Sequence, residues 1–365
     1  EDLMNIINSY KEFTPETKED LKKAVVFYYE NKDAGIKKYG VMNSWNVSKI
    51  TDMSRLFEEL YDFNEYINDW DVSNVTNMEY MFFRTSFNQP LNNWNTGNVT
   101  TMKTMFMRAD IFNQSLDNWD TSNVSDMSYM FYQAHNFDSP LDSWNTSEVT
   151  NMSYMFCDAQ QFNQTLNNWD TSSVLDMSYM FCEAYNFDQP IDNWDTSQVE
   201  NMTCMFRFAQ EFDQPLNNWN TGNVTNMSSM FCGARDFDHP LDSWNTSQVT
   251  DMSSMFCETN YFDYSLNNWD TSKVTNMSCM FCQAYTFNQS LDNWDTSQVT
   301  NMSSMFRKAH TFNQPLDNWN TSNVTNMSSM FNRAEHFNQP LNKWNTSKVT
   351  NMCSMFRMAR YFNYP

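Results

Sequence analysis

Eight cysteines are the residues of this chain whose type and spacing most directly suggest chemistry. Two of them follow another cysteine at a spacing of 22, which gives the pairs Cys182 with Cys204 and Cys257 with Cys279. We expect both pairs to be disulfides, which implies an oxidising compartment. The alternative is that they are buried or half-buried free thiols. Five cysteines share one place in a repeating pattern: Cys157, Cys182, Cys232, Cys257 and Cys282.

The other residue types that could do chemistry show no catalytic pattern. The four histidines are scattered and share no motif, so we expect solvated surface residues: His135, His239, His310 and His336. The chain has five glycines and no glycine-rich phosphate-binding loop. Carboxylates lie in regularly spaced columns rather than in one isolated pair, for example Asp117, Asp142, Asp192 and Asp242. We therefore predict no enzyme activity, no catalytic residue and no cofactor.

Two alternatives assign a ligand to the regularly spaced polar columns: calcium for the Asp and Asn columns, and ice for a Thr column. Asp and Asn oxygens at turns could hold calcium. Turn caps and side-chain ladders explain the same columns, and neither EF-hand spacing nor a Gly-rich calcium nonapeptide occurs. A flat array of threonines would resemble an ice-binding face, with one column at Thr246, Thr271 and Thr296.

Signals for asparagine-linked glycosylation are dense, because the recurring string WNTSNVTNMS creates them. In a secreted eukaryotic or viral protein we expect a subset of them to carry glycan, since sites near a strand or capping turn would be occluded. The candidate sites are Asn98, Asn145, Asn223, Asn245, Asn276, Asn320 and Asn345.

A regular repeating unit must position all of these side chains. Thirteen tryptophans recur at an interval of 25 from Trp45 to Trp344, with a single interval of 24 between Trp70 and Trp94. A period of this size indicates a solenoid, in which each coil buries its apolar residues against its neighbours. We therefore predict an α/β repeat solenoid of about thirteen coils, each with a short strand and a short helix.

The unit from Leu216 to Pro240 illustrates the predicted elements. From Met227 onward, its apolar residues have the spacing of an amphipathic helix, so we expect a helix over roughly residues 228–235. Residues 215–219 are expected to form a strand that pairs with its equivalent one coil away. The buried Trp219 indole needs a hydrogen-bond acceptor, for which flanking Asn and Asp side chains are candidates.

The predicted helices also bear on the cysteine pairing. Packed helices lie about 9–10 Å apart, whereas the Cα atoms of a disulfide lie within about 7 Å. Same-column neighbours such as Cys157 and Cys182 are therefore less suitable partners than the two pairs named above.

The two ends of the chain differ from the repeats between them. Residues 1–44 contain a predicted helix of about 15 residues, expected to cover the first coil as an N-terminal cap. Residues 45–365 are predicted to be one continuous solenoid. The final residues from Phe362 to Pro365 are in the same phase as Phe337 to Pro340. We expect either more chain or another subunit to cover that end, because terminal coils need a cap.

Charge and hydropathy argue against nucleic acid as a partner and against a transmembrane helix. The formal net charge is −22, and nine of the 22 basic residues lie in the first 55 positions. Nucleic acid is a poor partner, because its binding depends on Lys and Arg at the phosphates. The longest apolar run is about six residues near Ala24, far below the roughly 18–20 of a transmembrane helix.

The repeat string resembles a known family. The run from Trp319 to Phe331, WNTSNVTNMSSMF, followed by Phe337 to Pro340, FNQP, is similar to the BspA-like surface-protein repeat. That repeat is found in Mycoplasma- and Listeria-type surface lipoproteins and in proteins of large DNA viruses and aquatic microbes. The resemblance spans roughly residues 13–365 and implies a leucine-rich-repeat-like, cell-surface or adhesive protein with no defined catalytic residues. This chain departs from the family in its cysteines and in a one-residue deletion near Phe83 to Phe87, which should distort one coil.

These features lead to a functional expectation. We predict a non-enzymatic structural or adhesive repeat protein at a cell, virus or particle surface, with protein or glycan ligands. It could be a glycosylated subunit of a fibre in which solenoid ends stack into a homo-polymer. The alternative is an intracellular protein–protein interaction scaffold.

Overall fold

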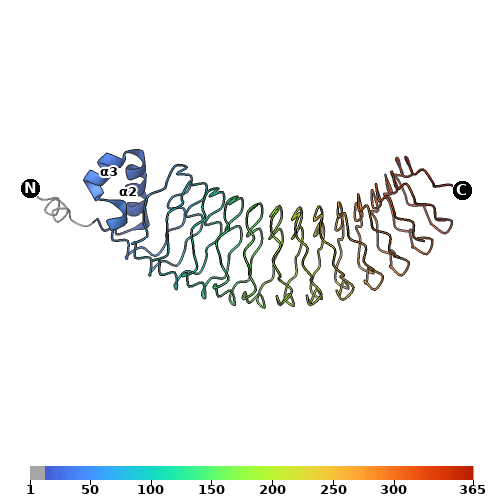
Figure 1. Ribbon diagram of the computed structural model, residues 1–365, viewed down its shortest axis with the longest axis horizontal. Coiled ribbons are helices and arrows are strands. Elements are labelled where there is room, and N and C mark those ends of the chain that lie inside the picture. The colour runs from blue at the N-terminus through green and yellow to red at the C-terminus, as the bar shows by residue number, and fades with distance from the viewer. Residues whose placement is uncertain (1–12, 365) are drawn as a thin grey trace, which may run out of the picture. The chain divides into compact units, whose positions relative to one another are not determined.

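The computed structural model describes residues 13–364, which form two compact units, one up to Asp170 and one from Thr171. Three helical elements lie at the start of the first unit (Figure 1): α2 at Lys18–Glu30, α3 at Lys32–Tyr39 and the 3-10 helix η1 at Met42–Ser44. Within the described residues, no helix follows η1. Nor does any helix there have the length and hydropathy needed to cross a membrane.

The first helix forms where the sequence predicts one. Thr17 caps α2 by accepting a hydrogen bond from the amide of Asp20, at 3.1 Å. Asn31 separates the two helices, and its side chain accepts from the amide of Ala34, the third residue of α3. One apolar stripe of α2 is buried: Leu21, Ala24, Val25 and Tyr28.

Helix α2 supplies hydrogen-bond donors to the first coil. Lys22 Nζ donates to the backbone carbonyls of Arg55 and Leu56, at 2.7 and 2.8 Å. Lys18 Nζ bonds to the Asp52 carboxylate at 2.9 Å. In the next coil the carbonyl of Met81, equivalent to that of Leu56, accepts from the amide of Phe57 at 3.0 Å. Lysines of α2 therefore occupy acceptors that a preceding coil would otherwise use.

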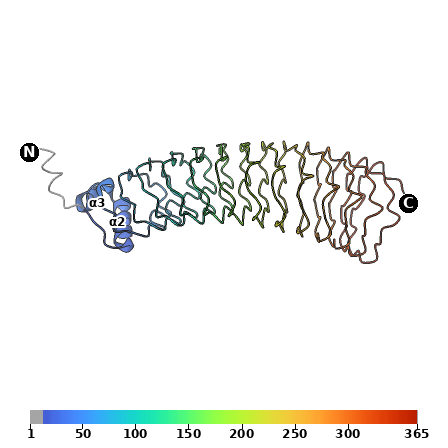
Figure 2. The ribbon, with the colours of Figure 1, turned by 90° about the horizontal axis from the view of Figure 1, so that it is seen from below.

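The coils are built from turns, so the predicted helix over residues 228–235 is wrong. The amide of Met230 donates to Met227 three residues back, at 3.2 Å, as in a β-turn. The amides of Ser229 and Phe231 instead donate to Ser253 and Met255 of the next coil, at 2.8 and 3.0 Å. Successive amides thus alternate between an acceptor in the same coil and an acceptor in the next coil. The second unit (Figure 2) is a succession of such coils without helices.

The predicted strand over residues 215–219 is also wrong. The amide of Trp219 donates to Leu216 at 3.3 Å, which closes a turn. Coils pair at isolated parallel bridges further along the unit, for example between Asn226 and Asp251. Side-chain spacing from coil to coil is therefore set by strand-like pairing, about 4.8 Å, rather than by helix packing.

Two columns of residues with positive φ make these turns possible. In the unit after Trp219 they are Ser229 and Gly233, with φ of 55° and 75°. A positive φ at the third residue of a β-turn is the type II feature, which glycine adopts at lowest cost. Most coils use a residue other than glycine there, such as Arg84 and Arg108 with φ of 57° each. Stacking against neighbouring coils holds this backbone in place.

Aromatic columns form the core of each unit. In the first unit the rings of Trp94 and Trp119 stack at 6.2 Å, and in the second those of Trp219 and Trp244 stack at 6.3 Å. The indole of Trp244 donates to the backbone carbonyl of Leu216, at 3.0 Å. The expectation that Asn or Asp side chains serve as indole acceptors is therefore wrong for this column.

The threonine column proposed as an ice-binding face lies inside the protein. Thr246, Thr271 and Thr296 are each 1% exposed. The hydroxyl of Thr246 donates to the carbonyl of Asp270 in the next coil, at 3.0 Å. These threonines join successive coils and present no flat outer surface.

Candidate functional site

One side of each coil varies in sequence while the rest repeats. In the unit after Trp219, the varying positions are Ser229, Cys232, Gly233, Arg235 and Asp236. Ser229 is half-buried and Arg235 and Asp236 are exposed, whereas Cys232 and Gly233 are buried beneath them. We call these five positions and their equivalents in the other coils the variable face. Since thirteen copies share one framework, differences between copies are concentrated on the surface that can distinguish ligands.

The one-residue deletion lies on the variable face. A single residue, Ser86, separates Thr85 from the core residue Phe87, whereas the next coil has both Asp110 and Ile111 at this place. The expected distortion is confined to the surface. Phe87 still stacks on the equivalent rings of the coils on either side, at 5.9 and 6.2 Å. The amide of Ser86 bonds to the carbonyl of Tyr61 at 2.7 Å.

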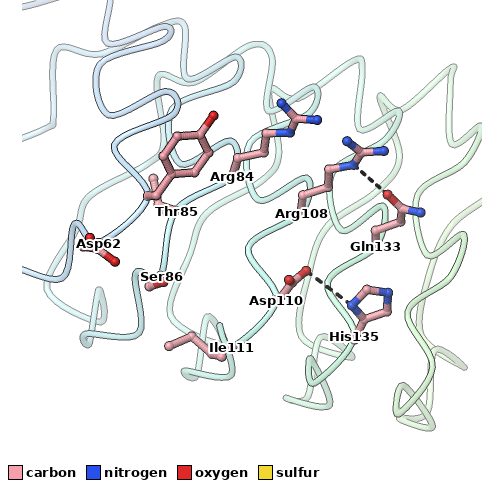
Figure 3. Close-up of a pocket in the computed structure, with 10 residues that line it drawn as sticks. Asp62, Arg84, Thr85, Ser86, Arg108, Asp110, Ile111, Gln133 and His135 are labelled. Carbon is pink, nitrogen blue, oxygen red and sulfur yellow. Dashed lines mark hydrogen bonds and ion pairs between the residues drawn. The ribbon is translucent and has the colours of Figure 1, made fainter.

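A cavity of about 470 Å³ opens at this deletion. Tyr61 and Asp62 line one side, Asp110 and Ile111 of a later coil line the other, and Ser86 lies between them. At this point of the coil Ser86 stands in place of the two residues that the next coil has. We call this cavity the Ser86 notch (Figure 3).

Two arginines lie at the Ser86 notch. Arg84 forms an ion pair with Glu59 at 3.0 Å, and its guanidinium lies 5.3 Å from the centre of the Phe83 ring. Arg108 donates through Nε to Gln133 at 2.6 Å (Figure 3). Among the described residues, no carboxylate pairs with Arg108. Its terminal amino groups can therefore bind a carboxylate in a forked arrangement.

His135 completes this network on the same face. Its Nδ1 lies 3.3 Å from a carboxylate oxygen of Asp110 (Figure 3). Its Nε2 lies 3.3 Å from a carboxylate oxygen of Asp158. Gln133 also bonds to Asp158, at 3.2 Å. The scattered histidines of the sequence give no sign that His135 meets two carboxylates, and no motif marks Arg84 or Arg108. The single shortened interval between tryptophans, together with basic residues in successive coils, is the signal that could have found this site.

The chemistry of the notch favours binding over reaction. The residues that line it include donors, carboxylates and two exposed apolar side chains, Tyr61 at 56% and Ile111 at 44% exposure. Within the described part of the chain, no hydrogen bond joins Ser86 to His135, as a serine nucleophile and its base would require. Such a lining suits a polar ligand with one apolar face.

Each of the eight cysteines is a thiol in the structure, so neither Cys182 and Cys204 nor Cys257 and Cys279 are joined in it. Cys204 and Cys182 lie near enough to interact electrostatically, and burial raises the pKa of the Cys204 thiol. Same-column cysteines such as Cys157 and Cys182 are not kept apart by packed helices, because the described coils contain no helix. The pairing of oxidised cysteines stays a prediction.

Acidic columns bond to neighbouring coils. The carboxylates of Asp142 and Asp192 accept from the side-chain amides of Asn168 and Asn218, at 2.5 and 2.6 Å. Between residues 13 and 364, no three His, Cys, Asp or Glu side chains form a group that could hold a metal ion. Burial and the nearby Asp213 raise the pKa of Asp238 in a further acidic column.

The candidate glycosylation sites fall into two environments. Asn276 is half-buried, and its side chain bonds through both its oxygen and its nitrogen. The other candidates are exposed: Asn98, Asn145, Asn223, Asn245, Asn320 and Asn345. Of these, Asn98 and Asn223 donate through the side-chain nitrogen to a carbonyl of the preceding coil, at 2.7 Å each.

The comparisons with known proteins point to a repeat family. A family described as "Mycoplasma protein of unknown function, DUF285" matches residues 26–142, 111–217, 165–266, 187–291 and 258–365. No curated protein matches the chain. A leucine-rich repeat protein from Eubacterium ventriosum ATCC 27560 is 11% identical, covers 87% of this chain and 83% of its own, and gives a TM-score of 0.39. The TLR13–ssRNA13 complex gives 10% identity, coverage of 79% and 52%, and a TM-score of 0.25.

The five family matches together span residues 26–365, which include the whole repeat region and the last part of the segment before it. They confirm the resemblance carried by the recurring WNTSNVTNMSSMF string. The chain belongs to the BspA-like repeat family described as Mycoplasma protein of unknown function, DUF285.

Proposed function

We propose that this chain is a non-enzymatic repeat protein of a cell or particle surface that binds an acidic sugar in the Ser86 notch. The observation that carries the proposal is the cavity of about 470 Å³ where one residue of the repeat is missing. Its volume lies within the roughly 300–1,000 Å³ range of small-ligand sites.

The lining favours a sugar that bears a carboxylate. Arg108 offers a forked pair of donors, which matches the two oxygens of a carboxylate. Asp62 and Asp110 would repel a compact polyanion but can accept hydrogen bonds from sugar hydroxyls. The exposed ring of Tyr61 offers an apolar surface for the face of a pyranose.

The surface location rests on the family resemblance and on the dense glycosylation signals. A stack of coils can present a long surface, so weak contacts elsewhere on the variable face would add to binding at the notch. Protein ligands of the same face remain part of this adhesive role.

Binding of the full chain to immobilised N-acetylneuraminic acid and glucuronic acid glycosides tests the proposal, with neutral galactosides for comparison. Loss of the charged fork in Arg108→Gln should weaken binding to the acidic glycosides roughly 10- to 100-fold. Arg333→Gln is the matched control, since Arg333 occupies the equivalent position with φ of 61° and does not line the notch. Equal binding by both variants would contradict the assignment.

A second variant tests the notch itself. Inserting one asparagine after Ser86 restores the regular repeat interval, so the added side chain should fill the recess and abolish acidic-sugar binding. Thermal unfolding should remain close to that of the parent, because the core rings on both sides are already in register. Undiminished binding by a folded insertion variant would exclude the notch as the site.

An intracellular interaction scaffold is the second candidate. Reduced cysteines are typical of cytosolic proteins, so free thiols in the isolated protein would favour this function. Mapping disulfides and glycans on protein isolated from its source distinguishes the two functions: bare asparagines and reduced thiols would support the scaffold.

Assembly into a fibre stays a prediction. Solenoid ends that stack on one another make a heterologous contact, which extends into a filament when the rotation does not close a ring. Sedimentation velocity of the full chain over a range of concentrations tests this assembly: a constant monomer would count against it.

A further inference from the structure

Three cysteines occupy one position in three consecutive coils of the second unit: Cys232, Cys257 and Cys282. Next to them, the amide of Gly233 donates to the carbonyl of Cys257 at 2.7 Å, and that of Glu258 donates to the carbonyl of Cys282 at 2.8 Å. These bonds place the cysteines in register, one coil apart.

The preceding residues confirm this close spacing. The rings of Phe231 and Phe256 stack at 5.9 Å, and those of Phe256 and Phe281 stack at 5.7 Å. Paired strands lie about 4.8 Å apart, and a disulfide usually has Cα atoms about 4.4–6.8 Å apart. Each neighbouring pair in the trio therefore satisfies the backbone requirement for a disulfide.

Arginines stand at both ends of the trio. The same repeat position is occupied by Arg207 in the coil before it and by Arg307 in the coil after it. Among the cysteines, Cys232 and Cys282 are buried, at 8% and 4% exposure, whereas Cys257 is half-buried. A positive charge next to each outer thiol favours its thiolate form, which is the reactive one.

The thiols are also coupled to one another. A hydrogen bond to Cys257 lowers the pKa of both the Cys232 and the Cys282 thiol, and the nearby arginines lower them further. The same two hydrogen bonds raise the pKa of Cys257. Each outer thiol lies next to a position occupied by arginine, so an outer residue is the better candidate for the nucleophile, with Cys257 as its hydrogen-bond partner.

We propose that Cys232, Cys257 and Cys282 form a redox-active thiol ladder, in which Cys257 forms a disulfide with either neighbour and the bond can pass from one neighbour to the other. The proposal is independent of acidic-sugar binding at the Ser86 notch. It assigns to the variable face of the second unit a reversible oxidation site.

A hydroperoxide is the oxidant, with hydrogen peroxide as the simplest case. The Cys232 thiolate attacks one peroxide oxygen, the O–O bond breaks, and a sulfenic acid and hydroxide form. Hydroxide takes the proton of Cys257 to give water. The Cys257 thiolate then attacks the Cys232 sulfur and displaces hydroxide, which becomes the second water on protonation. Two thiols and one peroxide thus give one disulfide and two waters.

The disulfide can then move without further oxidation. The Cys282 thiolate attacks the sulfur of Cys257, the bond between Cys257 and Cys232 breaks, and Cys232 leaves as a thiolate. Placing the three residues in one column puts the attacking and leaving groups on opposite sides of the central cysteine. No electrons are gained or lost in this exchange.

Peptide mapping of the full chain tests the ladder. The folded, reduced protein is treated with hydrogen peroxide, blocked with N-ethylmaleimide at slightly acidic pH, and digested without reduction. We expect linked peptides that join Cys257 to Cys232 and Cys257 to Cys282. Cys232→Ser should leave only the second link, and Cys282→Ser only the first. Predominant linkage of Cys257 to Cys279 would overturn the proposal in favour of the pairing expected from the sequence.

Removal of the central residue is the sharpest variant. In Cys257→Ser, Cys232 and Cys282 should acquire dimedone-reactive sulfenic acid with no disulfide between them. Cys279→Ser is the control and should retain both links of the trio. A link between Cys232 and Cys282 in the Cys257 variant, or parent protein whose trio stays fully alkylatable after peroxide, would overturn the ladder. The outer-residue variants test the pairing even if Cys257→Ser fails to fold.

Discussion

Gly233 lies against the ring of Phe208 in the preceding coil: a Cβ atom added to Gly233 would stand 2.1 Å from Phe208 Cδ1. The two residues occupy the same repeat position, and both have positive φ, 75° and 58°. Among the coils of the repeat, Phe208 is the aromatic residue at this position and Gly233 is the glycine. The absence of a side chain at Gly233 therefore leaves room for the ring of Phe208.

Replacing Gly233 by alanine should destabilise the second unit by about 1–3 kcal/mol, because the new methyl group overlaps the Phe208 ring and the backbone keeps a positive φ. Urea unfolding of the full chain measures the effect. Phe208→Ala provides the second arm of a double-mutant cycle. A coupling free energy near zero between the two substitutions would show that the close approach does not limit stability.

The buried threonines should contribute more to stability than the exposed ones. Thr271→Val removes the donor that bonds to the Asp295 carbonyl at 2.9 Å and should cost about 1–3 kcal/mol of unfolding free energy. Thr275→Val is a matched control in the same coil, since Thr275 is exposed and bonds to Thr250 at 3.2 Å. Thermal unfolding ranks the two variants, and a larger loss for Thr275→Val would contradict the prediction.

Contacts from α2 should stabilise the first coil. Lys22→Met removes two hydrogen bonds to the carbonyls of Arg55 and Leu56 and should cost roughly 1 kcal/mol. Lys23→Met, at an exposed neighbouring position, is the control. Amide hydrogen exchange of the first coil should accelerate in the Lys22 variant alone. Identical amide exchange rates in both variants would contradict a capping role for Lys22.

Glycan occupancy should follow the environment of each asparagine when the chain is secreted from a eukaryotic cell. Asn245 and Asn320 are exposed and bond through the side-chain oxygen, at 3.1 Å each. The nitrogen that receives the glycan makes no hydrogen bond within the described residues. We expect glycan there and none at half-buried Asn276. Glycopeptide mapping measures occupancy, and a higher occupancy at Asn276 than at Asn245 and Asn320 would contradict the prediction.

The sequence by itself determined that the chain is a stack of equivalent coils, one for each repeat. Repetition of Trp at a constant interval requires equivalent environments, and a stack of coils satisfies that requirement with one set of contacts. The same repetition identified the family and the aromatic core. Local patterns were enough to predict the helix within residues 1–44 that the structure shows as α2, because a helix depends on residues close in sequence.

Only the tertiary structure decided the path of the backbone inside each coil. Met227, Met230, Phe231 and Ala234 have helical spacing, yet a series of turns buries the same residues. The choice between them depends on whether alternate amides bond within the coil or to the next coil. Partners in the next coil, such as Met255 for Phe231, lie almost a full repeat further along the chain, so no local pattern can reveal them.

Tertiary structure also decided which side chains meet. Tyr61, Ser86, Arg108 and His135 are separated by about one repeat each, and stacking brings them to one cavity. The deletion was visible in the sequence, but its result was not, because a cavity depends on which side chains flank the missing one. The same reason applies to Cys232, Cys257 and Cys282: their spacing is evident from the sequence, whereas their closeness depends on pairing between coils.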